Sequence, residues 1–180
     1  KRGYHWLQCV KGKHQRQRHN KIRDEVNAML KKAQYNTKIE QKYKYDENQE
    51  EMVEDNKIPG DILVYRYDQG NDYYLDTVVG NIFAKTYIKE TSKDRLSLAK
   101  KKESDKVLKY RNLPYFIPLA VEVMGGIGDK FKYVLQNIAH KLATIKKMKY
   151  QVMMNRIRKR LIAILMKYNA KMIISSMLVD

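Results

Sequence analysis

Two aspartates, Asp61 and Asp76, lie in segments whose other residues favour β-strands. Asp61 directly follows Pro59-Gly60 and opens an apolar run, and Asp76 lies between Leu75 and Val78. An Asp inside an apolar strand is costly unless it binds a positive group. Two such carboxylates on paired strands can hold Mg²⁺, which accepts one or two carboxylates and fills its other positions with water and phosphate oxygens. The pair therefore predicts phosphodiester hydrolysis.

Whether the two carboxylates meet depends on the register of a predicted β-hairpin. Residues 61–67 and 73–79 are rich in β-branched and aromatic residues, and 68–72 have the composition of a turn. A turn centred between residues 68 and 69 places Asp61 opposite Asp76, ~5.5 Å away, whereas a turn centred on residue 70 separates them by ~10 Å. Only the first turn, or a bulged hairpin, makes one metal site. Otherwise both are surface residues on the polar side of the hairpin.

A cation beside the acids would stabilise the pentavalent phosphate or orient the attacking water. Lys106, Lys109 and Tyr110 are spaced so that Lys106 shares a helical face with the other two. These three residues are therefore candidates for the same site as Asp61 and Asp76.

The remaining elements are predicted from periodicity and turn signals. We expect a helix over 20–34 with Asn20 as its N-cap and Asn36 at its end, then a loose strand over 37–43 and an exposed acidic insertion over 46–55. A helix over 94–110 and a buried strand over 116–123, whose regular pairing begins at Pro118, predict a parallel strand-helix-strand unit. Over 150–172 an apolar helical stripe predicts a core face or a surface for a partner helix.

Charge points to a polyanionic partner. The 180-residue chain has a net charge of +17 and a single cysteine, so a disulfide framework is excluded and nucleic acid is the first partner to consider. Residues 1–23 contain eight Lys and Arg and no acid, and Arg156 and Arg160 lie on the basic side of the last helix.

The most hydrophobic region of the sequence is interrupted by charged residues, which predicts no membrane span. Because the chain starts at Lys1, we expect a piece of a longer protein.

The sequence lacks the motifs of several common enzyme classes. The sequence has no Walker loop, no G-x-S-x-G elbow, no H-E-x-x-H and no G-x-G-x-x-G, and Gly125-Gly126-Ile127-Gly128 is typical of a strand-to-helix turn. This argues against NTP hydrolysis, serine hydrolysis and hydride transfer.

The order of the motifs resembles a known family. Segments 18–24, 59–64, 75–78, 106–110 and 118–126 resemble the restriction-like endonuclease domain, of the PD-(D/E)XK superfamily, at the carboxyl end of polyproteins from site-specific non-LTR retrotransposons and related reverse transcriptases. The resemblance covers roughly residues 4–128. It implies an α/β fold with a three-layer restriction-endonuclease-like core, in which a mixed sheet is flanked by helices, and a long C-terminal helical extension.

The resemblance also implies roles for individual residues. Asp61 and Asp76 would bind Mg²⁺ (or Mn²⁺), with the Thr77 carbonyl as a third ligand, and Glu40 would fill the acidic position after the first helix. Lys109 or Lys106 would be the catalytic lysine, with Tyr110 beside it. Val78 stands where the superfamily usually has that lysine. The DNA would be contacted by basic side chains and one histidine, namely Arg16, Arg18, His19, Lys21, Arg23, Arg156 and Arg160.

The only cysteine gains an interpretation from the same family. His5 and Cys9 resemble the last two ligands of the zinc knuckle that precedes this nuclease, so Zn²⁺ would be bound in the full-length protein. The expected organisation is a basic N-terminal segment over 1–18, the remnant of a zinc knuckle, then an endonuclease core over 19–128 and the helical extension over 129–180.

The acidic pair and the charge predict a Mg²⁺-dependent nuclease, and the resemblance implies an endonuclease domain that nicks double-stranded target DNA to prime reverse transcription. The full-length protein would also bind the RNA of the element and act in the nucleus. One alternative is a catalytically inactive nucleic-acid-binding module of the same fold. Another is a scaffold that docks a partner helix through its Met-rich stripe. The oligomeric state and the target sequence are left open.

Overall fold

The protein has a four-stranded mixed sheet flanked by helices. The computed structural model describes residues 7, 14–39, 43–46, 51–54 and 60–177. The sheet has the order β1 (Asn36–Ile39), β4 (Ile62–Asp68), β5 (Asn71–Gly80) and β6 (Phe116–Glu122). The β5–β6 pair is parallel, and the other two pairs are antiparallel. The predicted α/β class with a mixed sheet is therefore confirmed.

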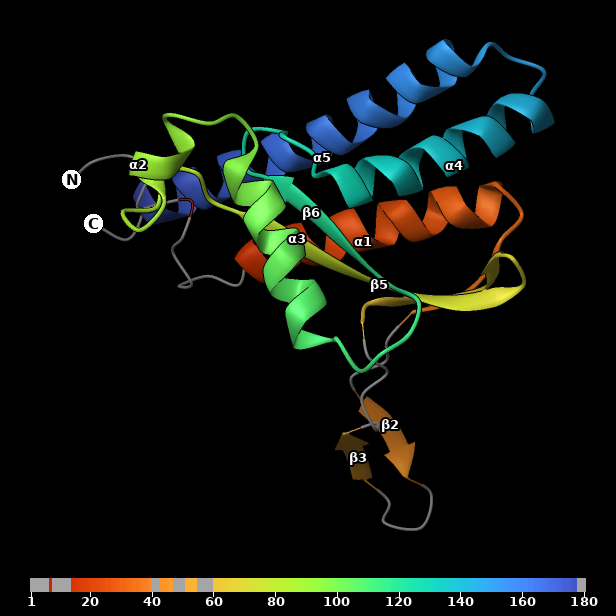
Figure 1. Ribbon diagram of the computed structural model, residues 1–180. Coiled ribbons are helices and arrows are strands. Elements are labelled where there is room, and N and C mark those ends of the chain that lie inside the picture. The colour runs from red at the N-terminus through yellow and green to blue at the C-terminus, as the bar shows by residue number, and fades with distance from the viewer. Residues whose placement is uncertain (1–6, 8–13, 40–42, 47–50, 55–59, 178–180) are drawn as a thin grey trace.

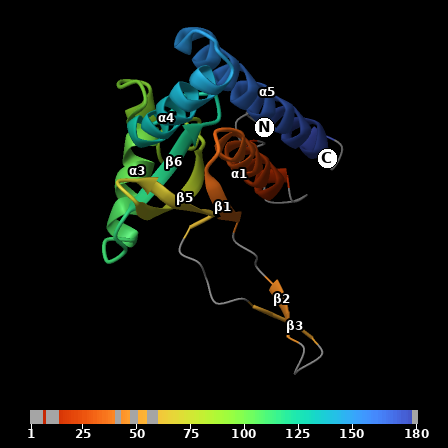
Figure 2. The ribbon, with the colours of Figure 1, turned by 90° about the vertical axis from the view of Figure 1, so that its right-hand side faces the viewer.

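Helices cover both faces of the sheet (Figures 1 and 2). Helix α3 (Ser97–Lys109) lies on one face, and α1 (His14–Lys32), α4 (Asp129–Ile145) and α5 (Tyr150–Met177) gather on the other. The short helix α2 (Ile88–Thr91) was not predicted. Around the predicted acidic insertion, which spans 46–55, β2 (Tyr43–Asp46) and β3 (Glu51–Glu54) form a separate two-stranded sheet.

The main core lies between the sheet and helices α1, α4 and α5. Alternate strand residues such as Leu75, Leu119 and Val121 belong to it, together with Phe131 of α4 and Leu161 of α5. The apolar stripe predicted over 150–172 is buried in this core for most of its length, so it does not provide the free docking face that a scaffold would need. Residues 129–177 thus share one core with the sheet. No helix in the described ranges is both long and apolar enough to span a membrane.

Strand β6 is an edge strand, which explains how it accepts a proline. Pro118 is its third residue, aligned with Asp76 of β5, and not the start of its regular pairing as predicted. The outer edge of β6 pairs with the turn that follows it: the Glu122 amide donates to the Gly126 carbonyl (2.7 Å), and the Gly128 amide donates to the Ala120 carbonyl (2.9 Å). The sequence Gly125–Gly128 is therefore a strand-to-helix turn, as predicted.

Helix α1 begins six residues earlier than predicted. Its first turns contain Arg18, which is buried, so packing extends the helix upstream of the predicted N-cap Asn20. It ends at Lys32, and the left-handed residue that terminates it is Gln34, with φ of 63°, and not Asn36. The Tyr35 amide donates to the Leu30 carbonyl across this left-handed residue, which closes the helix in a Schellman motif.

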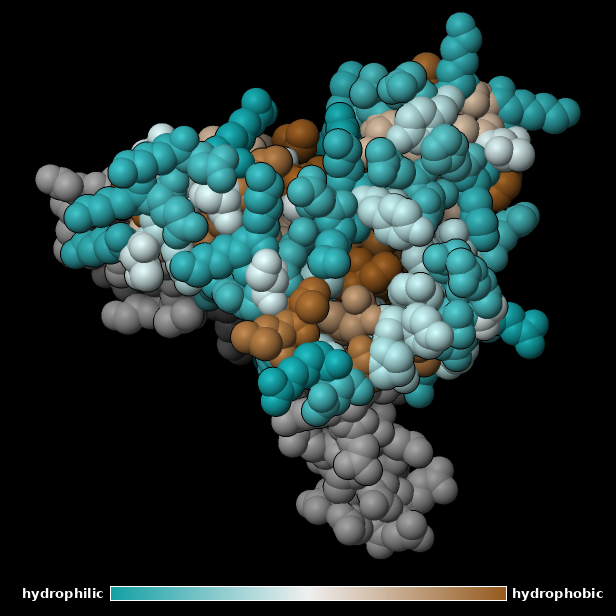
Figure 3. Space-filling model, in the orientation of Figure 1, coloured by the Kyte–Doolittle hydropathy of each residue, from teal (hydrophilic) through white to brown (hydrophobic). Residues whose placement is uncertain are grey.

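Helix α3 is shorter than predicted, and only its amino-terminal half is well buried. Leu98 and Ala99 are buried, whereas Val107 is 39% exposed and Leu108 is 67% exposed. Figure 3 shows a hydrophobic patch at the carboxyl end of α3 on a surface that is otherwise largely hydrophilic.

Two buried glutamates connect the helices to the sheet. Glu122, at the end of β6, accepts a hydrogen bond from the Ala99 amide in the first turn of α3 (3.2 Å). Glu103 of α3 accepts hydrogen bonds from the amides of Lys130 and Phe131 in the first turn of α4 (3.0 and 3.2 Å). Each carboxylate satisfies amides that the helix itself leaves unpaired. Burial raises the pKa of Glu103, although these hydrogen bonds oppose that effect.

Gly128 leaves the space that Glu103 occupies. A Cβ at residue 128 would lie 2.2 Å from the Glu103 Oε1 atom, while the backbone φ of −64° is one that alanine adopts freely. We therefore expect Gly128→Ala to displace the carboxylate and to lower the free energy of unfolding by about 1–2 kcal/mol, the value of a lost helix cap. Urea denaturation at pH 7 measures the change.

Glu103→Ala provides the control for this prediction. In the Glu103→Ala background the steric conflict is gone, so adding Gly128→Ala should cost less than about 0.5 kcal/mol. Equal costs of Gly128→Ala in both backgrounds would contradict the steric explanation.

Candidate active site

The predicted hairpin is formed by β4 and β5, and it is bulged. Asp68 pairs with Asn71 across a turn at Gln69 and Gly70, whose φ values are 49° and 79°. Beyond the turn the register shifts by two residues, so that Ile62 lies opposite Leu75. The bulge includes Arg66, with φ of 49°. This is the bulged alternative considered from the sequence.

This register brings Asp61 next to Asp76 on neighbouring strands. Asp61 immediately precedes β4, and its amide donates to the Leu75 carbonyl (2.8 Å). Gly60 has φ of 104°, and a Cβ there would lie 3.0 Å from the same carbonyl, so glycine is needed at this position. Asp61 and Asp76 are 6% and 7% exposed, and the Asp61 charge is close enough to raise the pKa of Asp76.

Asp61 is held by two groups. Its Oδ2 atom accepts a hydrogen bond from the Thr77 amide (2.7 Å) and lies 3.1 Å from His19 Nε2. His19 Nε2 is also 2.9 Å from the Thr77 carbonyl oxygen. Burial alone would raise the pKa of Asp61, but the His19 ring and the Thr77 amide hold it below its usual value. Burial by itself would lower the pKa of His19, but the hydrogen bond and the charge of the Asp61 carboxylate raise it above its usual value.

Asp76 is paired with a lysine of α3, the helix on the face of the sheet opposite to α1. Lys106 Nζ of α3 forms an ion pair with Asp76 Oδ2. Burial raises the pKa of Asp76, and the Lys106 charge offsets only part of that rise. Lys109 does not take this place: it is exposed, and its Nζ lies over the Tyr110 ring, 4.9 Å from the centroid. Tyr110 in turn packs against Phe116, with ring centroids 4.5 Å apart.

A hollow of about 360 Å³ is lined by His19 and Lys106, the two side chains that contact the carboxylates. Four polar side chains from two helices line it, Gln15, Arg16 and His19 of α1 and Lys106 of α3, and its floor includes Thr77 and Val78 of β5. The hollow is positively charged on both sides and lies against the strand that carries Asp76. It can accept an anionic group, such as a phosphate, next to the acids.

The donor set of the site fits a hard cation. Two carboxylates, from Asp61 and Asp76, and the Thr77 carbonyl supply oxygen ligands only, which Mg²⁺ and Mn²⁺ prefer. Among the described residues, no group of three or more His, Cys, Asp or Glu gathers as a metal centre. A Mg²⁺ site with one or two carboxylates does not need a third, because water and phosphate complete it. Glu40, His5 and Cys9 lie outside the described residues.

Arg18, one of the residues predicted to bind nucleic acid, is buried. Its side chain is 1% exposed, and its Nη1 atom donates to Asn169 Oδ1 of α5 (2.7 Å). Asn169 Nδ2 donates onward to the Val123 carbonyl (2.7 Å), just after β6. Burial lowers the pKa of Arg18 to about 10. Arg18 is therefore a structural link between α1, α5 and the end of β6, and the prediction that it contacts phosphate is wrong.

The other predicted nucleic-acid residues lie on the surface with different partners. Arg16 and Lys21 are exposed. Arg23 pairs with the neighbouring Asp24 (2.8 Å) and Arg160 with Glu25 (2.7 Å), whereas Arg156 Nη1 contacts the Met148 sulfur (3.2 Å). Of the predicted nucleic-acid residues, Arg16 and His19 line the hollow beside the acids.

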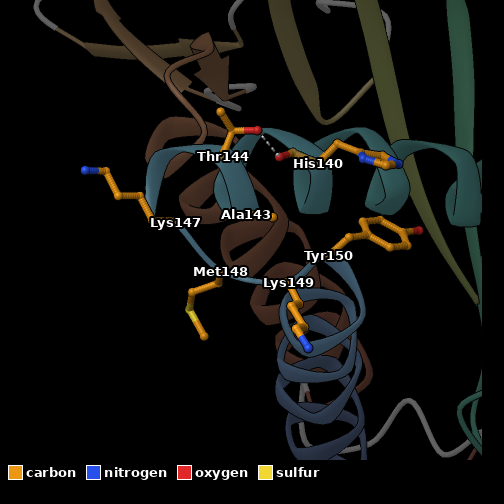
Figure 4. Close-up of a pocket in the computed structure, with 7 residues that line it drawn as sticks. All are labelled: His140, Ala143, Thr144, Lys147, Met148, Lys149 and Tyr150. Carbon is orange, nitrogen blue, oxygen red and sulfur yellow. Dashed lines mark hydrogen bonds between the residues drawn. The ribbon is translucent and has the colours of Figure 1, made fainter.

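A separate hollow lies at the turn between α4 and α5, and it lacks the carboxylates and the converging cations of the Asp61–Asp76 site. The His140 and Tyr150 rings stack there, with centroids 4.1 Å apart. Figure 4 shows that Lys147 and Lys149 point in different directions and do not converge on a common point. No carboxylate lines this hollow, so it does not compete with the Asp61–Asp76 site.

Comparisons of the chain with protein-family models, with curated proteins and with solved structures find no match.

The buried position of Arg18 leads to a prediction about stability. Arg18→Ala removes the donor to Asn169 and leaves a cavity, so we expect a loss of about 2–4 kcal/mol in the free energy of unfolding. The exposed neighbour provides the control, because Arg16→Ala should change stability by less than about 0.5 kcal/mol. Urea denaturation of both variants is the measurement, and equal stability of the two would argue against the buried link.

Proposed function

We propose that this chain is a metal-dependent DNA endonuclease domain with a restriction-endonuclease-like core. The observation that carries the proposal is the pair of buried carboxylates, Asp61 and Asp76, on neighbouring strands. Each is compensated by a cation-forming side chain from a different helix, His19 or Lys106, and these two side chains line a hollow that is suited to a phosphate. Phosphodiester hydrolysis needs these components in one place.

The residues of the site have distinct roles in this proposal. Asp61, Asp76 and the Thr77 carbonyl would hold Mg²⁺ (or Mn²⁺), which supplies positive charge to a bound phosphate and acidity to a bound water. Lys106 keeps its ammonium group at the site, with its side chain 24% exposed toward the hollow, so it can donate to a phosphate oxygen or to the attacking water. His19 fixes the orientation of Asp61, and Arg16 can bind a phosphate at the rim.

The charge distribution supports double-stranded DNA as the substrate. The net charge is +17, and residues 130–179 contain twelve Lys and Arg but no Asp or Glu. Most of these basic residues are exposed on α4, on α5 and in the turn between them. Binding should therefore weaken steeply with salt, because phosphate contacts release counterions.

The wider biological setting rests on the motif resemblance. We propose that the domain belongs to a retrotransposon polyprotein that nicks target DNA in the nucleus, so that the free 3′ end primes reverse transcription. The full-length protein would also bind the RNA of the element, and Zn²⁺ through His5, Cys9 and residues upstream.

An inactive nucleic-acid-binding module is the second candidate. The observation that favours it is that two protein cations already occupy the acids: Lys106 contacts Asp76 and His19 contacts Asp61. If these contacts persist on DNA, the same charges would bind a duplex without cutting it.

Plasmid nicking distinguishes the two functions. We expect the protein to convert supercoiled plasmid to open circles at low salt with Mg²⁺ or Mn²⁺, and not with EDTA. Asp76→Asn should reduce the rate by about 100-fold or more, because it removes a charged metal ligand without changing the shape of the side chain. Gel analysis of the topological forms measures the rate.

The exposed neighbour Asp105 supplies the matched control. Asp105→Asn should nick like the parent protein, and circular dichroism should show that both variants are folded. Plasmid that is retarded on the gel but remains uncut with both metals would support the binding module instead.

The two candidate lysines can be separated by the same substitution. Lys106→Met should lower nicking about 100-fold, because it removes the cation beside Asp76. Lys109→Met removes the same charge from the same helix, three residues away, and should change nicking by less than about threefold, since one peripheral phosphate contact contributes little. Initial nicking rates at fixed salt test this, and a larger loss for Lys109→Met would assign the catalytic role to Lys109.

A further inference from the structure

A second charged hollow, of about 520 Å³, lies at the carboxyl end of β6. It is bounded by the loop before α3, by the β6–α4 turn and by helices α4 and α5. Six of its twelve lining residues have apolar side chains, and two of these, Met124 and Ile162, are 56% and 41% exposed. Leu96, another lining residue, has φ of 65°, an uncommon conformation for a leucine.

Three cations surround this apolar lining, and each comes from a different element. Arg95 precedes α3, Lys132 is on α4 and Arg158 is on α5, and all three are exposed. None of them forms an ion pair with a carboxylate of the described residues. The single acid in the lining, Glu122, is 7% exposed and accepts a hydrogen bond from the Ala99 amide. The hollow therefore has a surplus of positive charge.

We propose that this hollow binds one unpaired nucleotide of a nucleic acid. The phosphate would lie among Arg95, Lys132 and Arg158, and the base would lie against Met124 and Ile162. Phosphate contacts alone need no apolar lining, and a duplex keeps its base faces stacked inside. An apolar surface ringed by cations is complementary to a nucleotide whose base is free.

The second hollow is close enough to Asp61 and Asp76 for one nucleic-acid molecule to reach both sites. Asp76 is aligned with Pro118, and Glu122 follows Pro118 by four residues in the same strand. Along the strand this is roughly 13 Å, about four nucleotide steps of B-form DNA. The inference rests on the nucleic-acid binding in the proposed function, and it adds a preference for DNA with an unpaired segment close to the cut.

Fluorescence anisotropy in EDTA tests the proposal, since no cleavage is expected there. Three labelled DNAs of equal length would be compared: a single strand, a duplex with a single-stranded tail and a blunt duplex. The variants are Arg158→Gln with its neighbour Lys159→Gln as control, and Ile162→Ser with Ile174→Ser as control. Lys159 and Ile174 are exposed on the same helix but do not line the hollow.

We expect Arg158→Gln to weaken single-strand and tailed-duplex binding about fivefold, and Lys159→Gln less than about twofold. Ile162→Ser, which changes no charge, should weaken the same two DNAs about threefold and leave the blunt duplex unchanged, whereas Ile174→Ser should have no effect. The residues changed are all exposed, so the fold should persist, and thermal melting checks this.

Two results would overturn the proposal. Equal effects of each variant and its control would mean that the hollow is only part of a diffuse positive field. Competition by free adenosine monophosphate as strong, per nucleotide, as by the single strand would assign the hollow to a mononucleotide. Nicking does not enter this measurement, so a protein that binds tailed DNA as expected but fails to cut plasmid would refute the nuclease and not this site.

Discussion

The arrangement of the helices around the sheet depends on two buried negative charges. Asp61 and Asp76 lie side by side with little exposure to water, and an uncompensated carboxylate in such a place is strongly unfavourable. Compensation comes from both faces of the sheet: α1 provides His19 for Asp61, and α3 provides Lys106 for Asp76. The amino end of α1 and the carboxyl end of α3 are therefore tied to the same point, and the hollow between them follows from that constraint.

A second pair of carboxylates fixes the amino ends of α3 and α4. Glu122 holds the amino end of α3, and Glu103 passes the connection on to α4. Such contacts between a side chain and the first turn of another helix orient the helix as well as satisfy its amides. Glycines at positions 126 and 128 are the counterpart, because a Cβ at either position would overlap Glu122 or Glu103. The β6–α4 turn is thus shaped by the acids that it accommodates.

The sequence predicted the strands and the acidic pair better than it predicted the helices and their cations. Runs rich in β-branched and aromatic residues identified β4 and β5, and a continuous apolar run identified β6, whose residues are almost all buried. The sequence left the bulge around Arg66 open, because this left-handed residue is not a glycine. Lys106 and Lys109 lie on the same helix, so spacing and resemblance left both as candidates for the place beside Asp76. Arg18 was assigned to DNA from its charge and its place in the first motif. The contact that buries Arg18 involves Asn169, 151 residues away, and a single sequence carries no signal for such a pairing.

The edge of the sheet has a consequence for how the protein behaves at high concentration. Unpaired strand edges tend to recruit strands from other molecules, which leads to aggregation. Along the outer side of β6, Pro118 has no N–H group to offer, and the Ala120 carbonyl and the Glu122 amide are already bonded to the following turn. The opposite edge, β1, is only four residues long. A strand from another copy would find few free backbone groups along β6 and only a short edge at β1, so the described part of the sheet offers little room for edge-to-edge polymerisation.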